Sequence, residues 1–187
     1  MKSPSLSLAL AALALGLPAG AANAGIVTLG DNSMAGDCFD FAERGDSRMD
    51  ALTICSRALK LEPLDTENRA ATHVNRGVLR MIHQDYVAAE RDFDTALALD
   101  PEQSDAWLNK GFLRLRHGDG AAALPYLERA MKLGMRRPAL VYFARGIAHE
   151  QSGNLRAAYD DLRRAREMEP GWSMPEQALS RYQLVAR

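Results

Sequence analysis

The sequence is poor in aromatic residues and in cysteine, and it has no long apolar run beyond its first residues. Aromatic residues make up 6% of the chain, and stretches of alternating Val, Ile, Thr and aromatic residues are missing, which argues against a β-sheet protein. Basic residues are not in excess, at 23 against 24 acidic ones, whereas a nucleic-acid-binding protein would need such an excess. The sequence has 47% apolar residues, many of them alanine, which is typical of close-packed helices.

The sequence also lacks the short motifs of common catalytic and metal sites. Neither His-Glu-x-x-His nor Gly-x-Ser-x-Gly occurs, and the glycines are isolated, whereas a phosphate-binding loop would bring several of them together. No two histidines have the short spacing of a zinc site. We therefore predict that the chain is not an enzyme and has no metal or other cofactor. The four histidines are His73, His83, His117 and His149.

The first 24 residues have the features of a secretory signal peptide. Lys2 precedes an apolar run at residues 6–17, Pro18 interrupts that run, and Ala-Asn-Ala at 22–24 has the small residues of a cleavage site. The run is too short to span a bilayer, and no later stretch is long enough. Cleavage after Ala24 would leave 163 residues with 22 basic and 24 acidic side chains. We expect an exported protein, located in the periplasm or secreted, without a membrane span in its mature chain.

A short phrase recurs along the chain and reveals an internal period. Asn-Arg-Gly-Val-Leu-Arg at 75–80 is followed by Asn-Lys-Gly-Phe-Leu-Arg at 109–114. A repeat length of about 34 residues is typical of helix–turn–helix units, in which Gly and Ala recur where two helices approach closely. The small residues that recur together, at intervals of 34 or 35 and with a first interval of 38 in the two alanine series, are Gly77, Gly111 and Gly146, then Ala51, Ala89, Ala123 and Ala158, and Ala58, Ala96, Ala130 and Ala165.

These positions resemble the tetratricopeptide repeat family, whose units carry a large residue, Gly or Ala, Ala, an aromatic residue, Ala and Pro at set offsets. The resemblance covers about residues 32–170, and the first unit matches only in its second helix, at Ala51, Cys55, Ala58 and Pro63. It implies a right-handed α-solenoid and a protein-binding role. The third and fourth units match at Trp107, Gly111, Gly118, Ala123, Leu127 and Ala130, and at Tyr142, Gly146, Gly153, Ala158, Leu162, Ala165 and Pro170.

We therefore predict an all-α fold with about four helix–turn–helix units and a C-terminal capping helix. Ser173 and Glu176 have the spacing of a capping box, which would begin the last helix. The expected segments are a flexible N-terminal stretch at 25–36, a repeat domain at 37–187, units at 37–65, 66–102, 103–137 and 138–171, and the capping helix at 174–186.

Cys38 and Cys55 are the only cysteines, and an even number in an exported chain favours a disulfide. In the repeat register Cys38 takes the position of Arg76 and Cys55 that of Phe93, two positions that are adjacent across one helix pair. A disulfide there would join the two helices of the first unit. The alternative is a redox-active pair, but such pairs are usually spaced as Cys-x-x-Cys.

A basic residue precedes each repeated glycine, at a position that is usually apolar in tetratricopeptide repeats. Asp92 lies sixteen residues after Arg76, and Asp161 sixteen after Arg145, so each arginine is expected to form a structural ion pair across its helix pair. In the unit between them, Tyr126 has the corresponding place after Lys110. A basic anion-binding site on an open face is the alternative.

Apolar residues on the first helices of the units are candidates for a partner-binding groove. They exceed what the facing helix of the same unit can cover, and an exposed apolar patch often marks an interaction surface. Such a groove could hold an amphipathic helix or an extended peptide. The alternative is that neighbouring units bury the stripe. The candidate residues are Val74, Val78, Met81, Leu108, Phe112, Leu115, Phe143 and Ile147.

The sequence thus favours a non-enzymatic interaction scaffold or adaptor in the cell envelope that binds another protein or peptide, and it does not identify that partner. Two other interpretations stay open. One is a self-associating structural module, for example a homodimer, and the other is an accessory subunit of an envelope assembly or a cell-wall enzyme.

Overall fold

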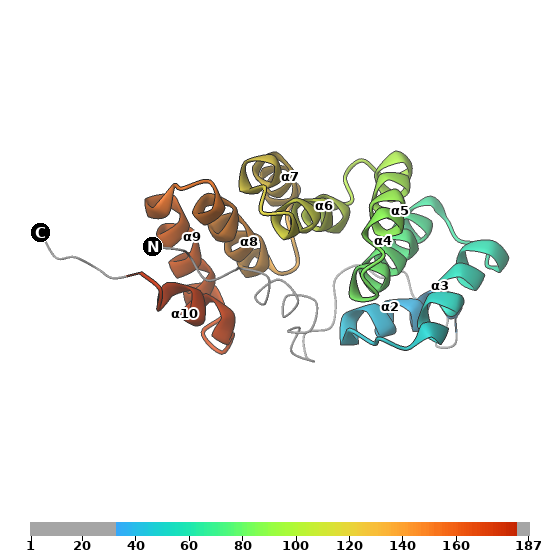
Figure 1. Cartoon of the computed structure of the whole chain (residues 1–187). Coiled ribbons are helices and arrows are strands. Elements are labelled where there is room, and N and C mark those ends of the chain that lie inside the picture. Colours follow the sequence, from blue (N-terminus) through green and yellow to red (C-terminus); the bar gives the residue numbers. More distant parts are fainter. Residues whose placement is uncertain (1–32, 183–187) are drawn as a thin grey trace, which may run out of the picture. The chain divides into compact units, whose positions relative to one another are not determined.

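The computed structural model describes residues 33–182, so the predicted signal peptide, residues 25–32 and residues 183–187 lie outside it. The described residues form nine α-helices, and none of them is in a strand (Figure 1). The prediction of an all-α fold is confirmed. The helices group into two compact units, one ending at Asn109 and the other beginning at Lys110.

The N-terminal unit contains two helical hairpins. α2 packs on α3 and α4 packs on α5, while α2 and α3 both contact α4. The unit also includes the first half of the next helix. The helices are α2 (Met34–Arg44), α3 (Met49–Leu61), α4 (Thr66–Ile82) and α5 (Tyr86–Leu99).

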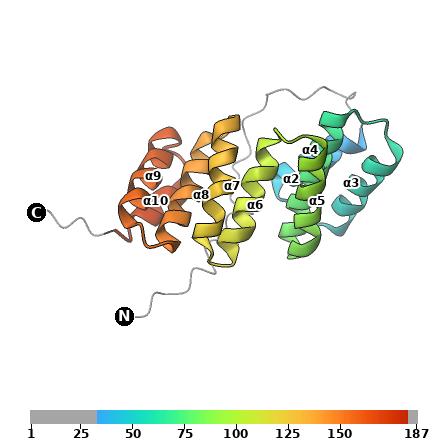
Figure 2. The ribbon, with the colours of Figure 1, turned by 90° about the horizontal axis from the view of Figure 1, so that it is seen from above.

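The C-terminal unit begins within α6 (Ser104–Arg116). In it α8 lies between α7 and α9, and α10 packs against α9 (Figure 2). The remaining helices are α7 (Gly120–Leu133), α8 (Pro138–Gln151), α9 (Leu155–Met168) and α10 (Ser173–Leu179).

Three hairpin turns share one design, in which a residue with left-handed backbone precedes the N-cap of the second helix. The N-cap side chain accepts a hydrogen bond from the backbone N–H three residues later, which satisfies a donor that the helix itself leaves free. Glycine adopts positive φ without steric cost, and two of the three turns have it. The pairs are Gln84 (φ 62°) with Asp85, Gly118 (φ 74°) with Asp119, and Gly153 (φ 78°) with Asn154.

The repeated glycine in the first helix of each hairpin lies against a large side chain of the second helix. A Cβ atom added at any of these glycines would lie within 3.0 Å of that side chain, closer than real Cβ contacts. The period of the sequence therefore reflects how closely paired helices approach. The contacts are Gly77 with Phe93, Gly111 with Leu127, and Gly146 with Leu162.

Both ends of the helical part differ from the prediction. Residues 34–36, expected to be flexible, are helical, because Ser33 caps α2 by accepting a hydrogen bond from Gly36 N–H at 3.0 Å. α10 ends at Leu179 instead of 186. The expected capping box is also wrong, since Trp172 is the N-cap of α10 and no side-chain cap bond forms there. Glu176 pairs with Arg166 of α9 at 3.1 Å instead.

Candidate functional site

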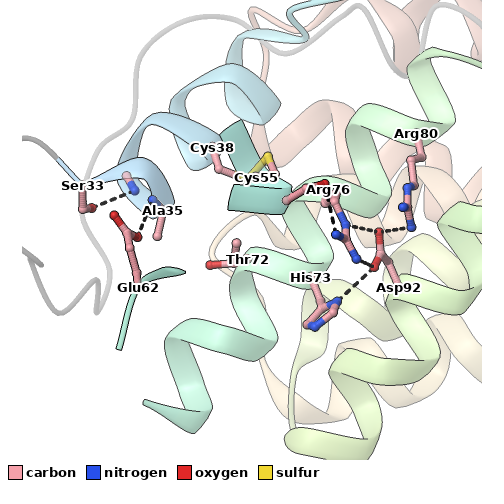
Figure 3. Close-up of a disulfide and its surroundings, with 12 residues drawn as sticks. Ser33, Ala35, Cys38, Cys55, Glu62, Thr72, His73, Arg76, Arg80 and Asp92 are labelled. Carbon is pink, nitrogen blue, oxygen red and sulfur yellow. Dashed lines mark hydrogen bonds and ion pairs between the residues drawn. A yellow bond between two sulfur atoms is a disulfide. The ribbon is translucent and has the colours of Figure 1, made fainter. Parts of the chain in front are cut away.

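Cys38 and Cys55 form a disulfide that joins α2 to α3, as the register predicts (Figure 3). The S–S distance is 2.08 Å and the Cα atoms are 4.9 Å apart. Both residues are fully buried, at 0% exposure, in a cluster with Ala42, Ala51 and Leu79. A buried disulfide among apolar side chains has the surroundings of a structural bond.

A second connection between α2 and α3 comes from Glu62, the C-cap residue that follows α3. Its carboxylate accepts a hydrogen bond from the backbone N–H group of Met34 at 2.7 Å. It accepts another from that of Ala35 at 3.0 Å (Figure 3). A negative charge at a helix N-terminus satisfies free donors and interacts favourably with the helix dipole. The first turn of α2 is therefore held by Ser33 and by Glu62 together.

In the next hairpin, Asp92 of α5 is the centre of a charged cluster supplied by α4 (Figure 3). Asp92 is 2% exposed. Arg76 donates from Nε to Oδ2 at 3.0 Å and from Nη2 to Oδ1 at 2.7 Å, as the sixteen-residue spacing predicts. Arg80 donates from Nη1 to Oδ2 at 2.7 Å, and His73 donates from Nδ1 to Oδ1 at 2.9 Å. Arg76 also donates to Ser56 Oγ of α3 at 3.2 Å, so the cluster links the two hairpins.

The environment of Asp92 stabilises its charged form. Burial by itself would raise the pKa of this carboxyl, but the hydrogen bonds from His73 and Arg76 and the charges of Arg76 and Arg80 outweigh burial and lower the pKa below its ordinary value. Both oxygens accept two hydrogen bonds each, so the carboxylate is an occupied structural anion. This geometry does not suit a general base, which must be free to accept a proton from a substrate.

Asp161 has the equivalent place between α8 and α9. Arg145 donates to it from Nε and from Nη2, both at 2.7 Å, and these are the bonds that the spacing predicts. Arg145 also donates from Nη1 to Met131 Sδ of α7 at 3.2 Å. The hydrogen bond to Asp161 raises the pKa of the Arg145 guanidinium despite its burial. His149 Nε2 lies 3.8 Å from Asp161 Oδ2 and occupies the register position of Arg80.

The hairpin of α6 and α7 has an aromatic ring where its neighbours have a carboxylate. Lys110 Nζ and the Arg114 guanidinium each lie 5.5 Å from the centre of the Tyr126 ring. A cation over an aromatic face is attracted by the ring quadrupole. The same register positions are therefore filled by cation–π contacts in this hairpin and by ion pairs in the other two.

The sequence prediction missed part of the Asp92 cluster. His73 and Arg80 lie three residues before and four residues after Arg76, so helical spacing puts all three on one face of α4. That spacing is visible in the sequence, and it could have identified both residues once Arg76 had been paired with Asp92. Nothing in the sequence marks Ser56, because its contact depends on how the two hairpins pack.

The residues expected to line an apolar groove are mostly buried. Only Val78 and Met81 of α4 are partly exposed. The other six candidate residues are buried, so the predicted open apolar stripe is absent there. The six buried residues, with their exposed fractions, are Val74 4%, Leu108 2%, Phe112 8%, Leu115 0%, Phe143 2% and Ile147 3%.

Two contacts show how parts of the expected groove are covered. The Trp172 ring, from the segment between α9 and α10, lies against Phe143 of α8, with the two ring centres 4.9 Å apart. In the N-terminal unit, Val78 packs against the buried cluster that includes both cysteines. The end elements of the fold thus cover surface that the sequence prediction treated as open.

Among residues 33–182 there is no group of three or more His, Cys, Asp or Glu side chains that could hold a metal ion. Within the same residues, no helix is both long enough and apolar enough to cross a membrane.

Comparison with known proteins gives a likeness of fold. No protein-family model matches the chain. Protein O-mannosyl-transferase TMTC1 of Mus musculus is 32% identical over 83 residues, which is 44% of this chain and 9% of TMTC1. The chain thus spans about a tenth of the length of this curated relative. The solved structure of the MamA RS-1 ArsTM double mutant aligns with a TM-score of 0.61 and 23% identity, covering 81% of this chain and 83% of that one. This likeness shows an all-α repeat fold of the tetratricopeptide type.

Proposed function

We propose that the chain is a non-enzymatic protein-interaction module that is exported to an oxidising compartment such as the periplasm. The observation that carries this proposal is the tetratricopeptide-type fold, because proteins that this chain resembles mostly bind other proteins. The buried Cys38–Cys55 disulfide is compatible with export, since such bonds persist in oxidising compartments. Fold alone does not define a partner, so the contact surface has to be argued from side chains.

The part of the expected groove that stays accessible lies on α4. Val78 and Met81 are three residues apart, which puts them on one side of the helix, and both are partly exposed. Methionine has a flexible, polarisable side chain that adapts to varied apolar surfaces. Because Val78 also packs against the buried cluster that contains both cysteines, Met81 is the proposed contact for an apolar segment of a peptide or helix.

A photo-crosslinking amino acid placed at Met81 tests this contact in cells that express the exported chain. We expect a discrete crosslinked partner from position 81 and none from position 49. Met49 of α3 is the matched control, because it is 67% exposed and lies outside the expected groove. Equal labelling from both positions would contradict a specific surface on α4.

Substitution tests the same surface independently of crosslinking. Met81→Glu should abolish recovery of that partner without a large change in melting temperature, whereas Met49→Glu should leave recovery unchanged. Phe112→Asp is unsuitable here, because Phe112 is 8% exposed and an unpaired buried charge would unfold the chain. Loss of partner with Met49→Glu as well would show that added charge alone prevents binding.

Export has its own test. The intact mass of the protein purified from the cell envelope should match a chain that begins at Gly25 and carries one disulfide. A mass that retains residues 1–24, or that shows two free thiols, would contradict the proposed compartment.

A further inference from the structure

The two compact units carry opposite net charge. Residues 33–109 have 15 acidic and 8 basic side chains, whereas residues 110–182 have 8 acidic and 13 basic ones. The net charges are therefore near −7 and +5, although the whole sequence is close to neutral at −1. This separation is hidden in the overall composition and appears only when the chain is divided where the structure divides it.

On the acidic unit, α2 presents a row of carboxylates. Asp37, Asp40 and Glu43 recur at intervals of three along the helix, and the side chains of Asp37 and Glu43 are exposed. Asp40 pairs with Arg44 at 3.1 Å. Neither Asp37 nor Glu43 has an ion pair or side-chain hydrogen bond with any residue between 33 and 182. Their charges are available to a partner.

On the basic unit, the corresponding surface lies at the end of α7 and in the segment that follows it. Arg129, Lys132 and Arg136 are exposed and recur at intervals of three and four. Within residues 33–182, the side chains of Arg129 and Lys132 have no hydrogen bond or ion pair. Arg137 beside them is engaged, since it donates to Glu169 at 2.7 Å and 3.3 Å.

We propose that two copies of the chain associate, with the acidic α2 surface of each copy against the basic α7 surface of the other. Complementary charge steers association and fixes the register of two surfaces. Each chain carries one acidic and one basic surface. A second copy of the chain can therefore neutralise both surfaces at once. A symmetric pair makes each contact twice, as two-fold symmetric dimers do.

This inference does not depend on the interaction function proposed above, because it requires no other protein. Exposed charge pairs are individually weak and are screened by salt. The pair should therefore be reversible and sensitive to ionic strength. Sedimentation velocity of the oxidised, signal-free chain over a range of concentrations is the primary measurement.

We expect concentration-dependent dimers at about 20 mM NaCl and an apparent Kd at least about tenfold weaker at about 300 mM, where the Debye length is well below 10 Å. A chain that stays monomeric at every concentration in low salt would overturn the proposal. So would a dimer that salt does not weaken, because apolar contacts would then hold it together.

Charge reversal tests the two surfaces. Arg129→Glu with Lys132→Glu should prevent dimers, and so should Asp37→Lys with Glu43→Lys, because each variant then brings like charges together. Mixing the two variants should restore a heterodimer, since reversed surfaces face each other. Failure of the mixture to associate, with both variants folded by circular dichroism, would rule out the assigned surfaces.

A matched control distinguishes the effect of charge on the α7 surface from the effect of the net charge of the chain. Arg129→Gln with Lys132→Gln and Arg57→Gln with Lys60→Gln remove the same number of exposed positive charges, the first pair from α7 and the second from α3. The first variant should weaken dimers, whereas the second should leave them unchanged or strengthen them. Equal weakening by both would show that only the net charge of the chain matters, and it would overturn the proposal.

Discussion

The first two hairpins use the same register position of their first helix for different chemistry. In α2–α3 the connection is a covalent bond between two fully buried sulfurs, and in α4–α5 it is a carboxylate that accepts hydrogen bonds from two arginines and a histidine. Cys38 and Arg76 occupy the same register position. The same repeat position thus connects the first helix to the second in both hairpins, by a disulfide in one and by an ion pair in the other.

The packing around these bonds also differs. In α4–α5 the small residue is Gly77 on the first helix and the large one is Phe93 on the second. In the same register α2–α3 has Phe39 on the first helix and Cys55 on the second. The larger residue is therefore on the first helix in α2–α3 and on the second helix in α4–α5. The α2–α3 hairpin, which lacks a glycine at the close-approach position, is the one with a covalent bond.

The largest expected effect comes from removing the centre of the charged cluster. Asp92→Ala would leave Arg76, Arg80 and His73 without their shared carboxylate, and breaking a buried pair in this way costs about 3–5 kcal/mol. Asp161→Ala should cost less, because only Arg145 donates strongly there. Thermal unfolding followed by circular dichroism measures both. Exposed Asp160→Ala is the control, and an unchanged melting temperature for Asp92→Ala would contradict the structural role of the cluster.

The disulfide comes next. Cys38→Ser with Cys55→Ser should lower the free energy of unfolding by about 3 kcal/mol in the chain-entropy model for a loop of this size. The buried residues of α2 other than Cys38 are Ala35 and Ala42. Met34 and Phe41 are only partly buried, so α2 buries little apolar surface apart from the disulfide. Hydrogen exchange should therefore show loss of protection in α2 before α4. Uniform loss across both helices would mean that the first hairpin does not open separately.

Lowering the pH should weaken the Asp92 cluster and leave the Cys38–Cys55 disulfide unchanged. Because the Asp92 pKa is lowered in the folded chain, its contribution is fully present above the unfolded value of about 3.9 and is lost as pH falls through the lower folded value. The sulfur bond does not titrate. Chemical denaturation of wild type and Asp92→Asn from pH 7 to pH 2 should show their stabilities converging below about pH 4, by at most about 1.4 kcal/mol per pH unit. A constant difference would argue against the lowered pKa.

The smallest expected effect is a gain in stability. Gln84 is the one non-glycine residue with positive φ among residues 33–182, and the matching turns have Gly118 and Gly153. Gln84→Gly should relieve left-handed strain and stabilise the chain by about 1 kcal/mol, less the entropy that glycine adds to the unfolded state. Gly118→Gln is the reciprocal variant and should destabilise. Two changes of the same sign would show that backbone strain does not control these turns.

Much of the fold could be predicted because its signals are local and periodic. Helix pairing follows from glycine and alanine at a constant interval, and the Arg76–Asp92 pair follows from a spacing of sixteen residues within one hairpin. The Cys38–Cys55 pairing follows from the same register. Each of these depends only on residues of a single helix pair.

The candidate binding surface could not be predicted in the same way, because exposure depends on packing between segments distant in sequence. Phe143 is covered by Trp172, which follows the next helix, and no periodicity indicates that contact. α10 likewise ends at Leu179 and not at residue 186. At its end, Ser180 Oγ donates to the Gln177 carbonyl at 2.8 Å.

The position of the disulfide has a consequence for work at the bench. Thiol reductants are common in purification buffers, and a bacterial cytosol keeps cysteines reduced. A preparation made under either condition would contain chains whose first hairpin lacks its covalent bond, next to a core cluster that includes Leu79. Such material would associate non-specifically, to an extent that varies between preparations. That association would result from the reduced disulfide and would resemble partner binding. Oxidised, mass-verified protein is therefore the proper starting material for every assay of association.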